Sequence, residues 1–254
     1  MINWEKLEEH LKIYYFYEID NNKSKNIVLF GNCHCLPIVY YLNNLLNNEY
    51  NFIVIISWYY QTTFDKNELE DITSKIKNII NKCDILIMQK HCSSFEINAS
   101  KIDEYVNDKC KIIIIPNFIL DYLSSKSNIL NNDLEEMKLI YNNSLLILCK
   151  SINESDFPNF LFIKNNINDI TFFNTIYHPT HYVLYLLSKN IFYKIKKLNN
   201  NISLDDYWDN KTREEFYNIN LDGFVFLPGK HNMSEIHYKV TNISFGRDYF
   251  DISF

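Results

Sequence analysis

The stretch KNIVLFGNCHCLPIVYY, residues 25–41, decides how this chain folds. An apolar run at 27–30 stops at Gly31, and apolar residues resume from Leu36 with the spacing of an amphipathic helix. We therefore predict a strand, a tight turn and a helix. Gly31 is the only glycine before Gly223, so its place at the end of the strand indicates a backbone requirement, either a positive φ or the close approach of a ligand.

The turn that follows this strand is the predicted site. Cys33 in the turn would lie at the N-terminus of a helix. There the partial positive charge of the helix and its free N–H groups favour a thiolate and bind anions. The sequence thus predicts an electropositive turn with a reactive thiol.

Composition bounds the class of protein. With 254 residues and 47% hydrophobic content, we expect one α/β domain over residues 1–254, with a core at about 25–190 and a C-terminal elaboration at about 191–254. The net charge of −6 argues against nucleic-acid binding. We find neither a signal peptide nor an apolar run long enough to cross a membrane, and so expect a cytoplasmic protein with six reduced cysteines and no membrane insertion.

Strand and helix patterns alternate through the first half of the chain. Continuous apolar runs predict four strands, at 27–30, 52–56, 85–88 and 111–115. Amphipathic patterns predict helices at 4–14, 65–81 and around 102–106. Continuous apolar strands between helices are typical of a parallel sheet covered on both faces. We predict a doubly wound α/β fold of the flavodoxin type.

Beyond residue 121 the pattern becomes mostly helical. We predict a helix at 133–149 capped by Asn132, and a helix that begins at His178-Pro179-Thr180-His181 with Pro179 in the first helical position. A short strand at 160–163 and late strands at 224–227 and 238–245 complete the predicted elements. The C-terminal part is therefore expected to be a mostly helical elaboration of the sheet.

Ligands of an open parallel sheet bind beyond the carboxyl ends of its strands, near the point where the strand order reverses. This rule selects the polar residues that follow each predicted strand: Asn32, Cys33, His34, Ser57, Trp58, Gln89, Lys90, His91 and Asn117. For Ser57, Trp58 and His91 we favour ordinary turn and cap roles. For Cys33 and Asn117 we favour a functional role.

Four short segments carry a family resemblance. Gly31-Asn32-Cys33-His34, Met88-Gln89, Ile115-Pro116-Asn117 and His178-Pro179-Thr180 follow one another in an order that resembles the WcbI-type polysaccharide-biosynthesis family. Members are regarded as coenzyme A-binding acetyltransferases of capsule and surface-glycan synthesis, with an α/β fold similar to that of SGNH esterases. The family usually has glutamine after Gly-Asn-Cys, where this chain has His34, and residues beyond about 190 match nothing in it.

The resemblance implies acetyl-CoA as the acyl donor and a sugar or nucleotide-sugar as the acceptor. It places the coenzyme A site at Gly31, Asn32, His34, Gln89 and Lys90. Cations for the coenzyme A phosphates could come from Lys90, Lys230 and Arg247.

The residue types suit acyl transfer independently of the resemblance. Cys33 is a candidate nucleophile, or a group that orients the thioester, and His178 is a candidate general base. The proline after His178 biases this histidine to an extended conformation, so that it would project toward a cleft, whereas His181 suits a partner or a packed role. The side chains of Asn32, Gln89 and Asn117 could donate hydrogen bonds to an oxyanion. With an already activated thioester donor, we slightly favour direct transfer over a covalent intermediate on Cys33.

Three alternatives remain open at this stage. A cysteine-dependent or SGNH-like hydrolase would use the same residues with water as the acceptor. A metal site at Cys33-His34-Cys35, with His91 or Cys92, has poor spacing, because structural zinc usually needs two to four residues between paired cysteines, so no metal is predicted. A non-catalytic glycan-binding module would fit the 19 tyrosines and 18 phenylalanines, although aromatic cores explain them equally.

Overall fold

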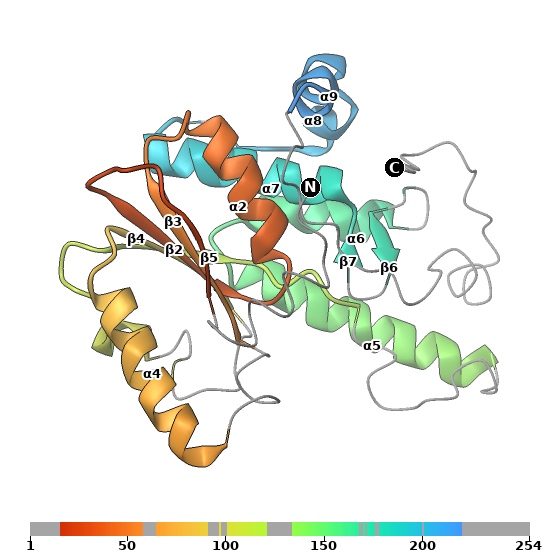
Figure 1. Cartoon of the computed structure of the whole chain (residues 1–254). Coiled ribbons are helices and arrows are strands. Elements are labelled where there is room, and N and C mark those ends of the chain that lie inside the picture. The colour runs from red at the N-terminus through yellow and green to blue at the C-terminus, as the bar shows by residue number, and fades with distance from the viewer. Residues whose placement is uncertain are drawn as a thin grey trace.

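A five-stranded sheet forms the centre of the protein (Figure 1). The computed structural model describes residues 16–57, 65–90, 97, 101–120, 134–167, 170, 172–175, 178–199 and 201–219. The strands are β1 (Phe16–Ile19), β2 (Asn26–Gly31), β3 (Asn51–Ile56), β4 (Ile85–Gln89) and β5 (Lys111–Ile115), in the order β1-β3-β2-β4-β5. Strands β2 to β5 run parallel. The predicted α/β class and all four predicted strands of the parallel sheet are confirmed.

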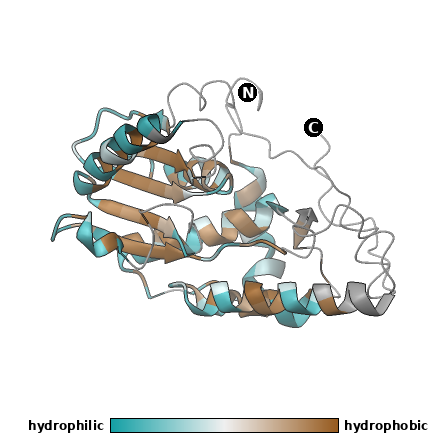
Figure 2. Ribbon diagram, turned by 90° about the horizontal axis from the view of Figure 1, so that it is seen from below, coloured by the Kyte–Doolittle hydropathy of each residue, from teal (hydrophilic) through white to brown (hydrophobic). Residues whose placement is uncertain are grey.

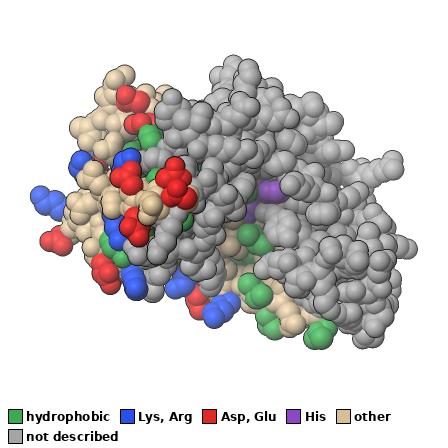
Figure 3. Space-filling model, turned by 60° about the horizontal axis from the view of Figure 1, so that its bottom comes forward, with side chains coloured by type: hydrophobic (Ala, Val, Ile, Leu, Met, Phe, Trp, Pro, Cys, Tyr) green, Lys and Arg blue, Asp and Glu red, His purple; other side chains and the backbone are tan. Residues whose placement is uncertain are grey.

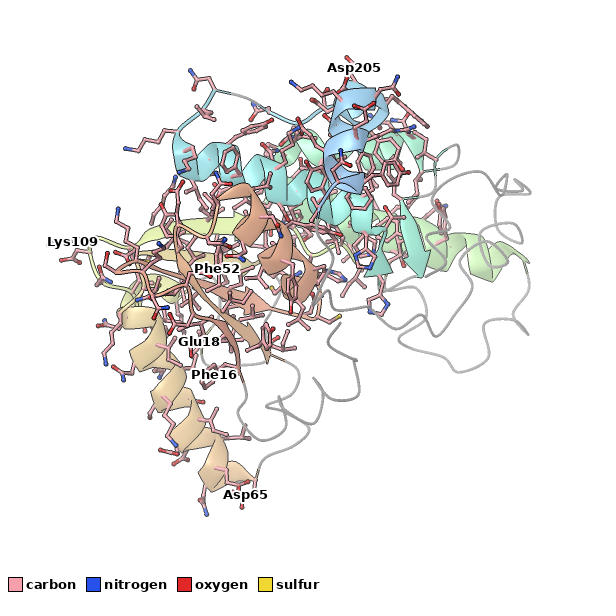
Figure 4. All side chains as sticks on the ribbon, turned by 45° about the horizontal axis from the view of Figure 1, so that its top comes forward. Phe16, Glu18, Phe52, Asp65, Lys109 and Asp205 are labelled. Carbon is pink, nitrogen blue, oxygen red and sulfur yellow. The ribbon has the colours of Figure 1, made fainter. Side chains whose placement is uncertain are left out.

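The edge strand β1 was not predicted. It pairs antiparallel with β3, from Phe16 opposite Ile55 to Ile19 opposite Phe52 (Figure 4). Its four residues include Glu18, so it lacks the continuous apolar run that marks the central strands. The helix predicted at 4–14 lies outside the described residues.

Helices cover both faces of the sheet. On β2, Ile27 and Leu29 point into a core shared with α2 (Cys35–Leu45) and α7 (His181–Lys196). Their neighbours Val28 and Phe30 point into a second core, shared with α4 (Lys66–Asn81). Figure 2 shows that the strands are hydrophobic along their lengths. Burial on both faces is the physical reason that these strands could be recognised from unbroken apolar runs.

Helix α4 agrees with the helix predicted at 65–81, and its start is fixed by a capping box. The Asp65 carboxylate accepts hydrogen bonds from the N–H groups of Asn67 and Glu68, and the Glu68 carboxylate accepts one from the Asp65 N–H. Figure 4 labels Asp65 at the N-terminal end of α4. The helix predicted around 102–106 is only one 3-10 turn, η1 (Ile102–Glu104).

The strand predicted at 160–163 is wrong. This stretch forms the 3-10 helix η3 (Pro158–Leu161) followed by α6 (Phe162–Asn166). Phe160 and Ile163, three residues apart, are both fully buried, which is helical spacing. A run of four apolar residues does not distinguish a strand from a buried helical turn, and Pro158 favours the start of a helix.

The helix at His178 begins later than predicted. His178–Pro179 is strand β7, paired antiparallel with β6 (Phe173–Thr175). Helix α7 starts at His181 after Thr180, whose hydroxyl accepts a hydrogen bond from the Val183 N–H at 3.3 Å. Pro179 is therefore not the first helical residue, because the better capping residue Thr180 comes after it.

The second half of the chain is mostly helical, with α5 (Leu134–Asn153), α8 (Leu204–Trp208) and α9 (Asn210–Tyr217) in addition to α7. The predicted cap Asn132 and the late strands at 224–227 and 238–245 lie outside the described residues. Among the helices of the described part of the chain, none combines the length and the apolar character needed to cross a membrane.

Candidate active site

The sheet order reverses at β2. From β2 the chain goes to β3 on one side of β2 and then to β4 on the other. The carboxyl ends of β2 and β4 are therefore where a ligand of this sheet would bind. Asn32, Cys33 and His34 follow β2, and Gln89 ends β4.

Gly31 is required by close packing. A Cβ atom at Gly31 would lie 2.5 Å from Gln89 Oε1 and 2.7 Å from Cys35 Sγ. Gln89 is fully buried, and its Oε1 accepts a hydrogen bond of 2.6 Å from the Asn32 N–H. The close approach at Gly31 is thus made by the Gln89 side chain, and neither a positive φ nor a ligand is needed to explain the glycine. Gly31 and Gln89 shape the turn from within the protein.

The first N–H groups of α2 are already used by the protein. The His34 N–H donates to Asn32 Oδ1 at 2.9 Å, and the N–H groups of Cys35 and Leu36 donate to the carbonyls of Asn32 and Cys33 at 3.1 Å. The next residue, Pro37, has no N–H. The expected anion site at this helix start is not formed, since a phosphate or a thiolate here would have to displace these internal acceptors.

The orientation of the Gln89 amide determines which of its atoms faces His34. Because Gln89 Oε1 faces the Asn32 N–H, its Nε2 faces Nδ1 of His34 at 3.5 Å. An amide NH₂ donates, so Nδ1 of His34 is the acceptor of this contact. His34 is buried and unsuited to direct contact with a large cofactor. Its ring meets the ring of His178 edge-on, with 6.1 Å between centroids.

Cys33 and His178 form the central pair of the site. Cys33 Sγ lies 3.5 Å from Nε2 of His178, although 145 positions separate the two residues along the chain. The turn after β2 positions the thiol, and β7 positions the imidazole. Both side chains are half-buried, and Figure 3 shows histidine side chains reaching the molecular surface. The contact has the donor and acceptor types of a nucleophile and its base.

Burial makes His178 and His181 weak bases. It lowers the pKa of His178 to about 4. Burial, with a smaller contribution from His178, also lowers the pKa of His181 to about 4. His181 contributes Nδ1 to a 3.2 Å contact with the hydroxyl of the buried Tyr41, so it has a packed role. At neutral pH His178 and His181 are therefore uncharged imidazoles.

Asn117 completes the network. Its Oδ1 accepts a hydrogen bond of 3.0 Å from Asn32 Nδ2, and its N–H donates to Ser151 Oγ of α5 at 2.7 Å. The Nδ2 group of Asn117 has no acceptor among the described residues and can donate to a ligand. Asn32 uses one side-chain N–H on Asn117, which leaves Asn117 the better placed of the two as an oxyanion donor.

Lys90 lies apart from this network. Its ammonium is 3.8 Å from a carboxylate oxygen of Glu154, and both side chains are about one-third exposed. A phosphate would have to compete with Glu154 for this cation. Ser57 is buried. The other residues considered at this edge lie outside the described residues: Trp58, His91, Cys92, Lys230 and Arg247.

The neighbouring thiols of the turn point in different directions. Cys35 is fully buried beneath Gly31, while Cys33 contacts His178. No group of three or more His, Cys, Asp and Glu side chains within the described ranges is arranged to hold a metal ion. The side chains of Cys33 and Cys35 thus do not converge on one point.

Three contacts of the site were not anticipated: Tyr41 with His181, Ser151 with Asn117, and Gln89 with His34. The first two depend on how α7 and α5 pack against the sheet, which no local pattern encodes. The third joins the ends of two predicted strands, β2 and β4, which pair in the sheet.

The two buried histidines predict a loss of stability in mild acid. Unfolded histidine has a pKa near 6.5, so between pH 6.5 and 4 the unfolded chain binds protons that folded His178 and His181 do not. Stability should be insensitive to these groups above pH 6.5 and should fall as pH decreases below it. From pH 7.5 to 5.5 we expect a loss of up to about 1 kcal/mol per histidine, less for the half-exposed His178.

Urea unfolding at the two pH values measures this loss. The double variant His178→Asn/His181→Asn should show a smaller difference between them, whatever its absolute stability. An unchanged difference in the variant would contradict the buried neutral state of these histidines.

Comparison of the chain with protein-family models, curated proteins and solved structures gives no match.

Proposed function

We propose that this protein is an acyltransferase that uses acetyl-CoA to modify a sugar or nucleotide-sugar, in the manner of the WcbI-type enzymes, and that its sheet is of the flavodoxin and SGNH type. The observation that carries the proposal is the 3.5 Å contact between Cys33 Sγ and His178 Nε2 at the carboxyl end of β2. A thiol beside an imidazole is a constellation for acyl transfer.

A second observation supports the family assignment. The resemblance rests on four short segments that are distant in sequence, and residues from all four meet in one network. Asn32 bonds both Gln89 and Asn117, and Cys33 contacts His178. Three of the segments end parallel strands of one sheet and meet for that reason, so the support comes from His178, which lies on β7 outside this sheet.

The contact favours a covalent route over the direct one. His178 Nε2 faces the thiol, so His178 can take the proton from Cys33 as the sulfur attacks the thioester carbonyl. Asn117 Nδ2 would stabilise the resulting oxyanion. Coenzyme A then leaves and takes the proton from His178. Its departure leaves an acetyl thioester on Cys33. In the second step His178 deprotonates the acceptor hydroxyl or amine, which takes the acetyl group and regenerates the thiol.

A histidine with a pKa near 4 holds a proton only transiently, which suits the step in which coenzyme A leaves. It returns the proton readily to a leaving thiolate. Proton transfer would therefore accompany attack on a bound substrate, and a stable thiolate is not needed.

Binding of coenzyme A should raise the melting temperature. A ligand present at 100 times its dissociation constant stabilises the native state by about 2.7 kcal/mol, which for a chain of this size is a shift of roughly 5–10 °C. Thermal denaturation with acetyl-CoA, coenzyme A and pantetheine as the phosphate-free control measures it. Absence of any shift at millimolar coenzyme A, with the protein shown to be folded, would count strongly against the proposal.

The same pair would serve a cysteine-dependent hydrolase, and the Cys33–His178 contact fits this second candidate equally well. The two differ in the final acceptor. Release of free thiol from acetyl-CoA that needs no sugar, and does not accelerate when sugars or nucleotide-sugars are added, would identify the hydrolase.

A further inference from the structure

Two further cysteines lie at the amino ends of the parallel strands, at the end of the sheet opposite to the candidate active site. Cys83 precedes β4 and Cys110 precedes β5, whereas Gln89 and Asn117 come at or after the other ends of these strands. The two sulfur atoms are 3.5 Å apart, and neither cysteine is in a disulfide. Lys109, labelled in Figure 4, marks the position of this end of the sheet.

The backbone around the two thiols is held in place. Asn107 Nδ2 donates to the carbonyls of Asn81 and Cys83, at 2.7 and 3.1 Å, and the Cys110 N–H donates to the Asn107 carbonyl at 2.9 Å. The Lys111 N–H donates to the Asp84 carbonyl at 2.9 Å. These bonds fix one loop against the other, so the two sulfur atoms meet without further ordering of the chain.

The two thiols are chemically unequal. Cys110 is half-buried, while Cys83 is only 2% exposed. The hydrogen-bonding contact with Cys83 lowers the pKa of the Cys110 thiol against the opposing effect of burial, and the Leu86 N–H contributes in the same direction. The same contact, together with burial, raises the pKa of Cys83. Cys110 is therefore the thiol that reacts first, and Cys83 is a protected partner beside it.

We propose that Cys83 and Cys110 form a reversible oxidation site, in which a peroxide converts the two thiols into a disulfide that joins the loops before β4 and β5. The two sulfur atoms lie 3.5 Å apart, so they must approach by about 1.5 Å to reach the S–S bond length of about 2.05 Å. The site is independent of the function proposed for Cys33.

The reaction balances in two steps. The Cys110 sulfur attacks one oxygen of hydrogen peroxide, the O–O bond breaks, and the departing hydroxide takes the thiol proton to give water and a sulfenic acid. The Cys83 sulfur then attacks the Cys110 sulfur. The S–O bond breaks, and hydroxide leaves with the Cys83 proton as a second water. Two thiols are oxidised, one peroxide is reduced, and a thiol reductant reverses the change.

Oxidation should stabilise the fold. The disulfide closes the loop 83–110, which limits the freedom of the unfolded chain. For a chain of this size we expect the melting temperature to rise by roughly 5–10 °C, and to return after treatment with dithiothreitol.

Peptide mapping of the whole protein tests the proposal. The protein is treated with one to a few equivalents of hydrogen peroxide, remaining thiols are alkylated, and the digest is analysed without reduction. We expect a linked peptide pair that contains Cys83 and Cys110. The variant Cys110→Ser lacks one of the two sulfur atoms and cannot form this pair, so it should lose the rise in melting temperature.

The variant Cys149→Ser is the matched control, since Cys149 is a buried cysteine on α5, and it should keep both effects. If wild-type protein keeps Cys83 and Cys110 alkylatable while other cysteines are oxidised, the proposal is wrong. A linked pair with any other partner would also overturn it. Because the mapping uses wild-type protein, this result does not depend on whether the variants fold.

Discussion

Cys33→Ser and His178→Asn should each reduce acetyl transfer by about two to four orders of magnitude, the weight that a nucleophile or a general base commonly carries. Serine keeps the shape of cysteine, but its hydroxyl is far harder to deprotonate than a thiol, and His178 is a weak base. Because Cys33 Sγ contacts His178 Nε2, the two losses should be comparable. The double variant should lose little more than either single one, since the two residues act as a unit.

Matched controls separate catalysis from folding. His181→Asn removes the other histidine with a low pKa, and Cys149→Ser removes a thiol outside the site. Both should retain activity within a few-fold, and coenzyme A should still raise the melting temperature of Cys33→Ser.

Intact-protein mass spectrometry after incubation with acetyl-CoA alone distinguishes the two routes. In the covalent route one acetyl group appears on Cys33, forms at a rate compatible with turnover, and is discharged when an acceptor is added. If His178→Asn is inactive, while Cys33→Ser is nearly fully active and no adduct forms, then transfer is direct. Full activity in both variants would remove the pair from the mechanism.

The parallel sheet was predictable because its strands are buried on both faces. Each of its strands is an apolar run with no polar interruption, and the turn at Gly31 separates strand from helix clearly. The edge strand β1 lacks this signal, because Glu18 interrupts its four residues. The stretch 160–163 was mispredicted, since its apolar content is the same in a strand and in a buried helical turn.

The candidate site was predictable as a set of residues and not as a network. The rule that ligands bind beyond the strand ends selected Cys33, Gln89 and Asn117, but it did not reveal which of these side chains would face solvent. The fully buried Gln89 bonds the Asn32 N–H and has its NH₂ group toward His34, so it acts on the turn from inside. The helix start was predicted to offer free N–H groups. Asn32 supplies two acceptors of its own, which local spacing alone does not reveal.

Gly31→Ala should destabilise the fold by about 2–4 kcal/mol, the sum of overpacking and a strained or lost buried hydrogen bond. The new methyl group would lie 2.5 Å from Oε1 and 2.9 Å from Cδ of Gln89. A flexible side chain at the surface would move aside. Gln89 is fully buried, and moving it would give up the 2.6 Å hydrogen bond from the Asn32 N–H.

A double-mutant cycle with Gln89→Ala tests whether Gln89 is the cause. Gln89→Ala alone should also destabilise, because it leaves the Asn32 N–H without its acceptor. Gln89→Ala, however, removes Oε1 and Cδ, two of the three atoms closest to an added Cβ at Gly31. In this background Gly31→Ala should therefore lower the free energy of unfolding by at least about 1 kcal/mol less than in the wild type. The remainder reflects Cys35 Sγ at 2.7 Å, which Cys35→Ala would remove. Equal costs of Gly31→Ala in urea unfolding of both backgrounds would mean that the glycine is required for another reason. A coupled result would show that β4 holds the turn of Cys33 in place through Gln89.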